Sequence, residues 1–252
     1  MIIEYHRPEN VEDALSLLAR KDPLTVALGG GSVLNRPSTS DKEVAVVDLQ
    51  ALGLNLIKPG GRSLKIGATV TLQAMLHIPE LPVALKSAIR HEATYNIRQV
   101  ATVAGALVAA NGRSPFATAM LALAPELILQ PGDEKIPFGE LLPLRTEQLS
   151  GRLITEVSIP LNTKLAYHYV ARTPADLPIV CVAVAQWPSG RTRVALGGYG
   201  SSPLLAMDGP NSQGADIAAK AAYHEAGDQW GSAQYRSDVA ATLTKRCLDE
   251  IK

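Results

Sequence analysis

Apolar and polar positions in the first half of the chain switch repeatedly between a strand pattern and a helix pattern. Short apolar runs bounded by turn residues predict strands at residues 2–4, 24–28, 44–49, 54–57 and 63–66, the last two as a hairpin. Asn10, followed three residues later by Asp13, predicts the N-cap of a helix that continues to Leu18. Helical periodicity returns at residues 72–76, 82–91 and 115–123. We therefore expect this part to mix helices and strands.

The second half separates strands from helices more clearly. Two apolar runs, 179–187 and 192–196, flank the turn sequence Pro188-Ser189-Gly190-Arg191 and predict neighbouring antiparallel strands. From Gly214 onward the chain is rich in alanine, and it is expected to end in a helix over 233–252. The predicted fold class is α+β, with mixed sheets and helices in a two-part domain at residues 1–162. An antiparallel sheet with C-terminal helices is expected at residues 163–252.

Composition and charge exclude several classes of protein. Apolar residues make up 46% of the 252 residues and charged residues 19%, which excludes a disordered chain. Lys plus Arg and Asp plus Glu both number 24, so the basic excess typical of nucleic-acid binding is absent. The longest strongly apolar stretch, 179–185, is far shorter than the ~20 residues of a membrane-spanning helix. With no secretory signal and only two distant cysteines, the chain is expected to be soluble and cytoplasmic.

The sharpest local feature is a strand that ends in Leu28-Gly29-Gly30-Gly31-Ser32. Glycines let backbone N–H groups approach an anion closely, so this segment is a candidate phosphate site, while a flexible turn is the alternative interpretation. Two nucleotide-binding motifs are excluded. No Gly-Lys-Ser/Thr sequence follows the glycines, and Pro37 leaves no room for the long helix of a dinucleotide-binding βαβ unit.

A second candidate is a run of small residues, Ala101-Thr102-Val103-Ala104-Gly105-Ala106. A backbone with so few bulky side chains is able to pack directly against a ligand. Ordinary tight packing explains the composition equally well, so both interpretations stay open.

The polar residues form no catalytic constellation. The five histidines are scattered without metal-ligand spacing, and Ser114 lacks the Gly-x-Ser-x-Gly elbow of a hydrolase. No catalytic or metal-binding residue is therefore predicted, and a bound cofactor is expected to carry any chemistry.

Several segments match, in order, the motifs of one known family. Residues 28–32 resemble an Ala-Gly-Gly-Thr-Asp loop, and residues 97–107 resemble an Ile-Arg-Asn-Val-Ala-Thr-Val-Gly-Gly-Asn-Leu stretch. Residues 172–177 and 194–200 match the start of that family's C-terminal domain, and residues 231–236 match its Gly-Ser-Ala-Glu-Tyr-Arg run. The chain thus resembles the FAD-binding (medium) subunits of molybdenum hydroxylases, the family of carbon monoxide dehydrogenase flavoproteins and of the xanthine dehydrogenase flavin domain.

This resemblance implies that residues 1–162 form an FAD-binding domain of two α/β subdomains. The diphosphate would be held by backbone amides of both glycine segments, which requires no basic side chain, so a site poor in Lys and Arg is expected. Ile154 takes the family's apolar position near the adenine. The implied cofactor-binding residues are Leu28, Gly29, Gly30, Gly31, Ser32, Val33, Thr102, Val103, Ala104, Gly105, Ala106, Ala109, Pro115, Ile154 and His168.

The chain departs from the family pattern at several of these positions. Ala104 stands at a glycine position and Ala106 at an asparagine position of the second motif. Pro115 stands where many relatives carry Asp, and His168 where some carry Lys. Each missing charge-assisted hydrogen bond is expected to cost roughly 1.5–3 kcal/mol of binding free energy.

Two functions follow from the resemblance. The first is an FAD-binding electron-transfer subunit of an oxidoreductase that takes electrons from an iron–sulfur (2Fe–2S) subunit, beside a large molybdopterin-binding subunit, and passes them to an external acceptor. The alternative is a structural subunit with weakened or lost FAD binding. An oxidase that acts alone is a third, weaker interpretation, because no general base or substrate-binding cluster is found.

Overall fold

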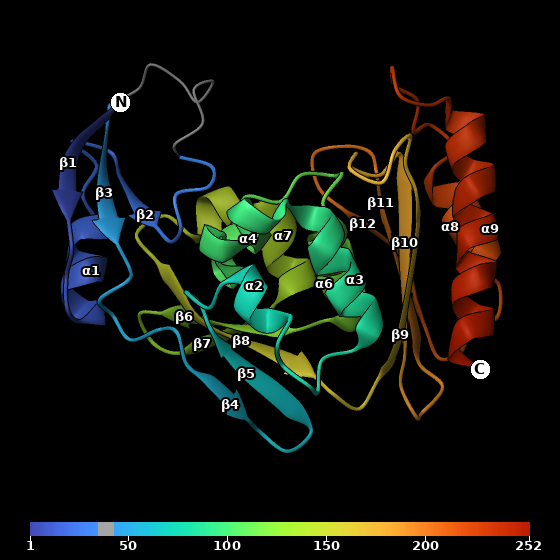
Figure 1. The fold of residues 1–252 in the computed structure, drawn as a ribbon, viewed down its shortest axis with the longest axis horizontal. Coiled ribbons are helices and arrows are strands. Elements are labelled where there is room, and N and C mark those ends of the chain that lie inside the picture. Colours follow the sequence, from blue (N-terminus) through green and yellow to red (C-terminus); the bar gives the residue numbers. More distant parts are fainter. Residues whose placement is uncertain (35–42) are drawn as a thin grey trace. The chain divides into compact units, whose positions relative to one another are not determined.

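The structure, a computed structural model, describes residues 1–34 and 43–252. It contains two compact units that interleave along the chain (Figure 1). The first unit is formed by Met1–His77, Tyr95–Ala109 and Glu126–Ile159. The second is formed by Ile78–Thr94, Ala110–Pro125 and Pro160–Lys252. The domain boundary placed between residues 162 and 163 stays a prediction.

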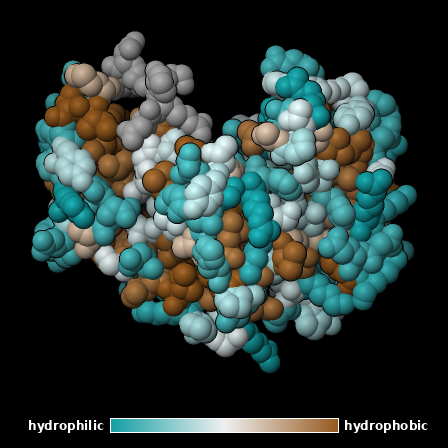
Figure 2. Space-filling view, in the orientation of Figure 1, coloured by the Kyte–Doolittle hydropathy of each residue, from teal (hydrophilic) through white to brown (hydrophobic). Residues whose placement is uncertain are grey.

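The first unit begins with a small parallel sheet in the order β1 (Ile2–His6), β3 (Val44–Asp48), β2 (Thr25–Leu28). Helix α1 (Val11–Leu18) packs on this sheet and buries Ala14 and Leu18 against Val47. The expected N-cap is confirmed, because the Asn10 side chain accepts a hydrogen bond from the Asp13 backbone N–H at 2.8 Å. Hydrophobic residues gather at the surface over β1, where Ile2 and Ile3 are exposed (Figure 2).

The rest of the first unit is built on a five-stranded sheet with short helices. The strand order is β4 (Ile57–Pro59), β5 (Ser63–Gly67), β8 (Leu153–Pro160), β6 (Glu126–Gln130), β7 (Glu134–Pro137). The helices are α2 (Leu72–Met75), α4 (Tyr95–Val100), α5 (Val103–Val108) and α7 (Phe138–Gln148). The expected hairpin forms, but its first strand begins at Ile57 rather than at Leu54, since the N–H of Thr69 donates to the Leu54 carbonyl outside the hairpin pairing.

The second unit has three layers. An antiparallel sheet in the order β12 (Leu204–Gly209), β11 (Thr192–Gly197), β10 (Val180–Gln186), β9 (Lys164–Val170) lies between two pairs of helices (Figure 1). Helices α8 (Ala215–Ala222) and α9 (Ala233–Ile251) cover one face, and α3 (Val83–Glu92) and α6 (Pro115–Leu123) cover the other. Because both faces are covered, the strand β11 is buried along its whole length. The α+β fold class and the antiparallel sheet with C-terminal helices are confirmed.

A fully buried arginine anchors the start of α9 in this unit. Arg236 donates hydrogen bonds to the carbonyl oxygens of Ile179 and Ala226 at 3.2 and 2.8 Å. It also pairs with the Asp228 carboxylate at 2.8 Å. Because a buried guanidinium requires many acceptors, this residue ties the loop before α9 to the start of β10. The sequence run 231–236 therefore has a structural role in the second unit.

A carboxylate at the end of α3 caps the start of α6. Glu92 Oε2 accepts hydrogen bonds from the Ser114 hydroxyl at 2.8 Å and from the Phe116 backbone N–H at 2.9 Å. Burial raises the pKa of this carboxyl group, and the two hydrogen bonds lower it by less. The negative charge also lies at a helix N-terminus, where it is favoured by the helix dipole.

We expect Glu92→Gln to alter the pH dependence of stability. Because the folded pKa of Glu92 lies above its unfolded value, the folded state binds the proton more tightly, and its contribution to stability grows as the pH falls. The free energy of unfolding of the wild type, relative to the Gln variant, should therefore rise as the pH falls from 7 toward the ordinary Glu value of 4.5. Urea denaturation over this pH range measures the difference in unfolding free energy between the two proteins. A difference that does not change with pH would refute the raised pKa of Glu92.

Candidate functional site

The two glycine segments of the first unit lie in direct contact. A Cβ added to Gly30 would overlap the carbonyl oxygen of Val100, and one added to Gly29 would lie 2.6 Å from the Thr102 hydroxyl oxygen. Gly31 has a φ of 69°, a left-handed conformation that favours glycine. The end of β2 can therefore reach the start of α5 only because these positions carry no side chain.

The second segment uses its backbone N–H groups within the chain. Thr102 caps α5, since its hydroxyl oxygen accepts a hydrogen bond from the Gly105 N–H at 3.2 Å. The N–H groups of Val103 and Ala104 donate to the carbonyls of Val70 and Ala68 at 2.8 and 3.2 Å, and that of Ala106 donates to Thr102 at 2.8 Å. A ligand that took these donors would have to replace the present bonds, so their predicted role toward a diphosphate stays a prediction.

The first segment leaves its donors available. Within residues 1–34 and 43–252, no group accepts a hydrogen bond from the N–H groups of Gly29, Gly30 or Gly31. The carbonyl oxygen of Gly29 accepts a hydrogen bond from the Gln50 side chain at 2.7 Å, which fixes the segment after it leaves β2. Three successive backbone donors at the end of a strand are suited to an anion such as a phosphate.

Both segments open onto one large cavity that lies wholly within the first unit. Its volume is about 840 Å³, within the range of pockets for small-molecule cofactors. Leu149, Thr25 and Leu18 form part of its wall. The cofactor-binding residues expected from the sequence that line this cavity are Gly29, Gly30, Gly31, Ser32, Val33, Thr102, Ala104, Gly105, Ala109 and Ile154.

The other residues expected to bind the cofactor do not line this cavity. Leu28, Val103 and Ala106 belong to the same two segments but do not line the cavity. Pro115 belongs to the second unit, where it is buried in the first turn of α6. His168 also belongs to the second unit, where its ring nitrogen pairs with Glu250 of α9 at 2.9 Å. Both residues thus have structural contacts within that unit.

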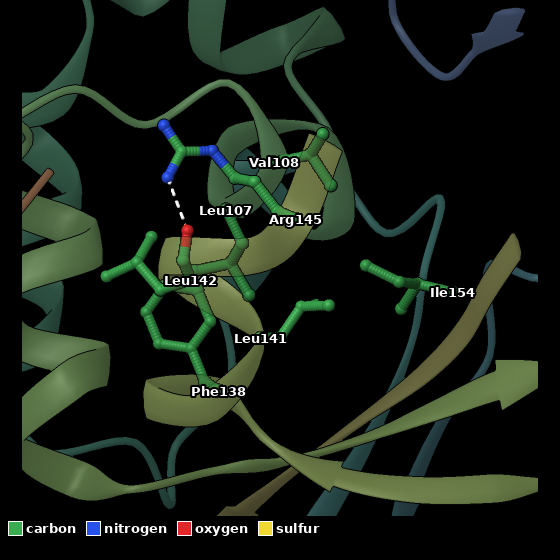
Figure 3. Close-up of a pocket in the computed structure, with 7 residues that line it drawn as sticks. All are labelled: Leu107, Val108, Phe138, Leu141, Leu142, Arg145 and Ile154. Carbon is green, nitrogen blue, oxygen red and sulfur yellow. Dashed lines mark hydrogen bonds between the residues drawn. The ribbon is translucent and has the colours of Figure 1, made fainter. Parts of the chain in front are cut away.

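A small apolar pocket lies beside the cavity, at α5 and α7. Leu107, Phe138 and Leu142 pack together there, beside Val108, Leu141 and Ile154 (Figure 3). Ile154 lines both this small pocket and the large cavity, as does Arg145, whose guanidinium donates to the Leu142 carbonyl at 2.6 Å (Figure 3). Ile154 is buried, with an exposed fraction of only 4%, and its expected place near the adenine stays a prediction.

Four basic side chains line part of the cavity, which corrects the expectation of a site poor in Lys and Arg. Arg20, Lys21, Arg145 and Arg152 line it, and none of the described residues that line it is Asp or Glu. The sequence does not single them out, because Arg20 and Lys21 lie far along the chain from Arg145 and Arg152 and the four form no motif. The fold brings them together, because Gly151 packs against Ala19. A Cβ built on Gly151 would lie only 3.7 Å from the Ala19 Cα.

Residues 1–34 and 43–252 hold neither a candidate metal cluster nor a candidate membrane-spanning helix. No group of three His, Cys, Asp or Glu side chains there is arranged to hold a metal ion. No helix in the same ranges is long and apolar enough to cross a membrane.

Comparisons with known proteins give the family. A family model, the FAD binding domain in molybdopterin dehydrogenase, matches residues 1–162. The uncharacterized protein YgfM of Escherichia coli (strain K12) is 33% identical over 211 residues, which cover 82% of this chain and 79% of that protein. Subunit alpha of the 6-hydroxypseudooxynicotine dehydrogenase complex of Paenarthrobacter nicotinovorans is 29% identical over 282 residues, which cover 97% of this chain and 93% of that protein.

A solved structure gives the fold independently. Carbon monoxide dehydrogenase from Hydrogenophaga pseudoflava contains a chain that matches with a TM-score of 0.84 at 22% identity, over 100% of this chain and 97% of that one. The fold and the family agree with the resemblance found in the sequence, and they support FAD as the cofactor and an oxidoreductase as the class of enzyme. The chain belongs to the family of FAD-binding domains of molybdopterin dehydrogenases.

Proposed function

We propose that this chain binds FAD in the large cavity of its first unit and serves as the flavoprotein subunit of a cytoplasmic, molybdenum-containing hydroxylase or dehydrogenase. In this proposal it accepts electrons from a 2Fe–2S subunit, beside a molybdopterin-binding large subunit, and passes them to an external acceptor. The observation that carries the proposal is a cavity of about 840 Å³ that meets the backbone donors of Gly29, Gly30 and Gly31, for which the described residues provide no acceptor.

The residues of the cavity fit the parts of FAD. The N–H groups of the first glycine segment suit the diphosphate, and the apolar wall around Ile154 suits a planar ring. Bound FAD supplies the redox chemistry, because a flavin can accept and release electrons singly or in pairs. The chain's own task is to orient the cofactor and to exclude water from part of its surface.

The partners are proposed from the relatives. Subunit alpha of the 6-hydroxypseudooxynicotine dehydrogenase complex is, by name, one component of an assembly, and this chain matches 93% of its length. In this proposal the electrons come from another protein of such an assembly. An iron–sulfur subunit is a donor of the required one-electron type.

The remaining residues implied by the resemblance belong to the same proposal. Leu28, Val103 and Ala106 would support the segments that line the cavity. Pro115 and His168 belong to the second unit, and their role toward FAD is carried over from the resemblance alone. Because both of the latter residues already have structural contacts, we expect their substitution to affect FAD affinity less than changes in the first glycine segment.

The first test is the visible spectrum of the purified protein. We expect a yellow protein, or a colourless one that takes up FAD on titration and shows the absorption bands of bound flavin. The apoprotein, prepared by removing free flavin, serves as the reference. A protein that stays colourless after titration would overturn the redox function and favour a structural subunit, the alternative suggested by the occupied donors of α5.

The second test is Gly30→Ala. Because the added methyl group would overlap the Val100 carbonyl, the two segments must move apart, which we expect to cost about 1–3 kcal/mol of stability and to weaken FAD binding at least about tenfold. Chemical denaturation and flavin titration measure the two effects.

Gly227→Ala is the matched control for this substitution. An added Cβ there has ordinary contacts, the nearest at 3.5 Å to the Ala233 nitrogen, and its φ lies outside the left-handed region. It should leave FAD binding unchanged. Wild-type FAD affinity in Gly30→Ala would contradict the assigned site.

A further inference from the structure

Four basic side chains line the cavity, although backbone N–H groups can bind a diphosphate without any basic side chain. We propose that Arg20, Lys21, Arg145 and Arg152 form a basic rim that binds the phosphate groups of the ligand and selects phosphorylated flavins over uncharged riboflavin. The inference rests on the proposed function, because it concerns the same cavity. It assigns the electrostatic part of recognition to residues outside both glycine segments.

The rim is formed where two helices end side by side. Helix α1 ends at Leu18, directly before Arg20 and Lys21, and α7 carries Arg145 in its last turn and ends directly before the 149–152 turn. The contact of Gly151 with Ala19 holds these two helix ends together. All four basic residues therefore line one cavity, even though more than a hundred residues separate the pair Arg20 and Lys21 from the pair Arg145 and Arg152.

Two of the four cations are partly neutralised by carboxylates that do not line the cavity. Arg20 pairs with Glu4 at 2.8 Å, and its hydrogen bond lowers the pKa of that carboxyl group, which keeps Glu4 ionised at neutral pH. Arg152 pairs with Glu134. Lys21 has no ion-pair partner among the described residues, so it contributes its full charge to the rim.

Helix dipoles offer a purely structural explanation for some of these residues. Cations near the C-termini of α1 and α7 stabilise the helices by typically about 0.3–1 kcal/mol each. That explanation does not account for the position of all four side chains at the cavity, nor for the lack of Asp and Glu among its described lining residues. A cation such as Lys21 beside an apolar wall attracts an anion more strongly than it would in water, because the local dielectric constant is lower.

The test compares FAD and riboflavin binding to Lys21→Met and to the wild type, by flavin fluorescence at low and at high salt. We expect Lys21→Met to bind FAD about tenfold more weakly, with unchanged riboflavin affinity and a weaker dependence of the FAD dissociation constant on salt. Lys58→Met is the control, because Lys58 is exposed on β4 and does not line the cavity. It should behave as the wild type.

Glu4→Gln tests the rim in the opposite direction. Removing the carboxylate that partly neutralises Arg20 should make FAD binding about threefold tighter at low salt and leave riboflavin binding unchanged. If the wild type binds FAD but both Lys21→Met and Glu4→Gln keep wild-type affinity and salt dependence, the basic rim is wrong and the proposed function stands. If the wild type binds no FAD, both proposals are overturned.

Discussion

The site depends on one close approach, the packing of Gly30 against the carbonyl oxygen of Val100. No side chain fits between these two groups, so glycine at this position lets the end of β2 rest on the segment that leads into α5. That contact joins the small parallel sheet to the part of the first unit that carries α5 and α7. It also sets the available donors of Gly29 to Gly31 at the edge of the cavity.

Overall charge and local charge carry different information in this chain. Equal numbers of basic and acidic residues give a net charge of zero, which argues against a nucleic-acid partner. The fold nevertheless places basic side chains around the cavity and keeps the carboxylates of Glu4 and Glu134 outside it. A protein with zero net charge can therefore have a positively charged cavity, and the net charge of the sequence does not reveal it.

Local signals in the sequence predicted much of the fold. The N-cap at Asn10 and the buried strands β10 and β11 follow from short-range patterns, and both are present. Helix α7 was missed because Pro143 lies inside it, and α5 because its small residues give a weak apolar pattern. The glycine segments of the site could be found in the same local way. The basic rim could not, because Arg20 and Arg152 become neighbours only through packing around Gly151.

The departures from the family motif weigh less in the structure than they do in the sequence. Ala104 and Ala106 lie in a segment whose N–H groups donate to Ala68 and Thr102 of the same chain, so this segment contributes shape rather than unused donors. His168 is engaged with Glu250 in the second unit. Each of these three residues therefore has a contact within its own unit. The N–H groups of Gly29 to Gly31, by contrast, have no acceptor among the described residues, and they lie at the same cavity as the four basic side chains. A long basic side chain can adjust its position at this cavity, whereas a backbone amide cannot.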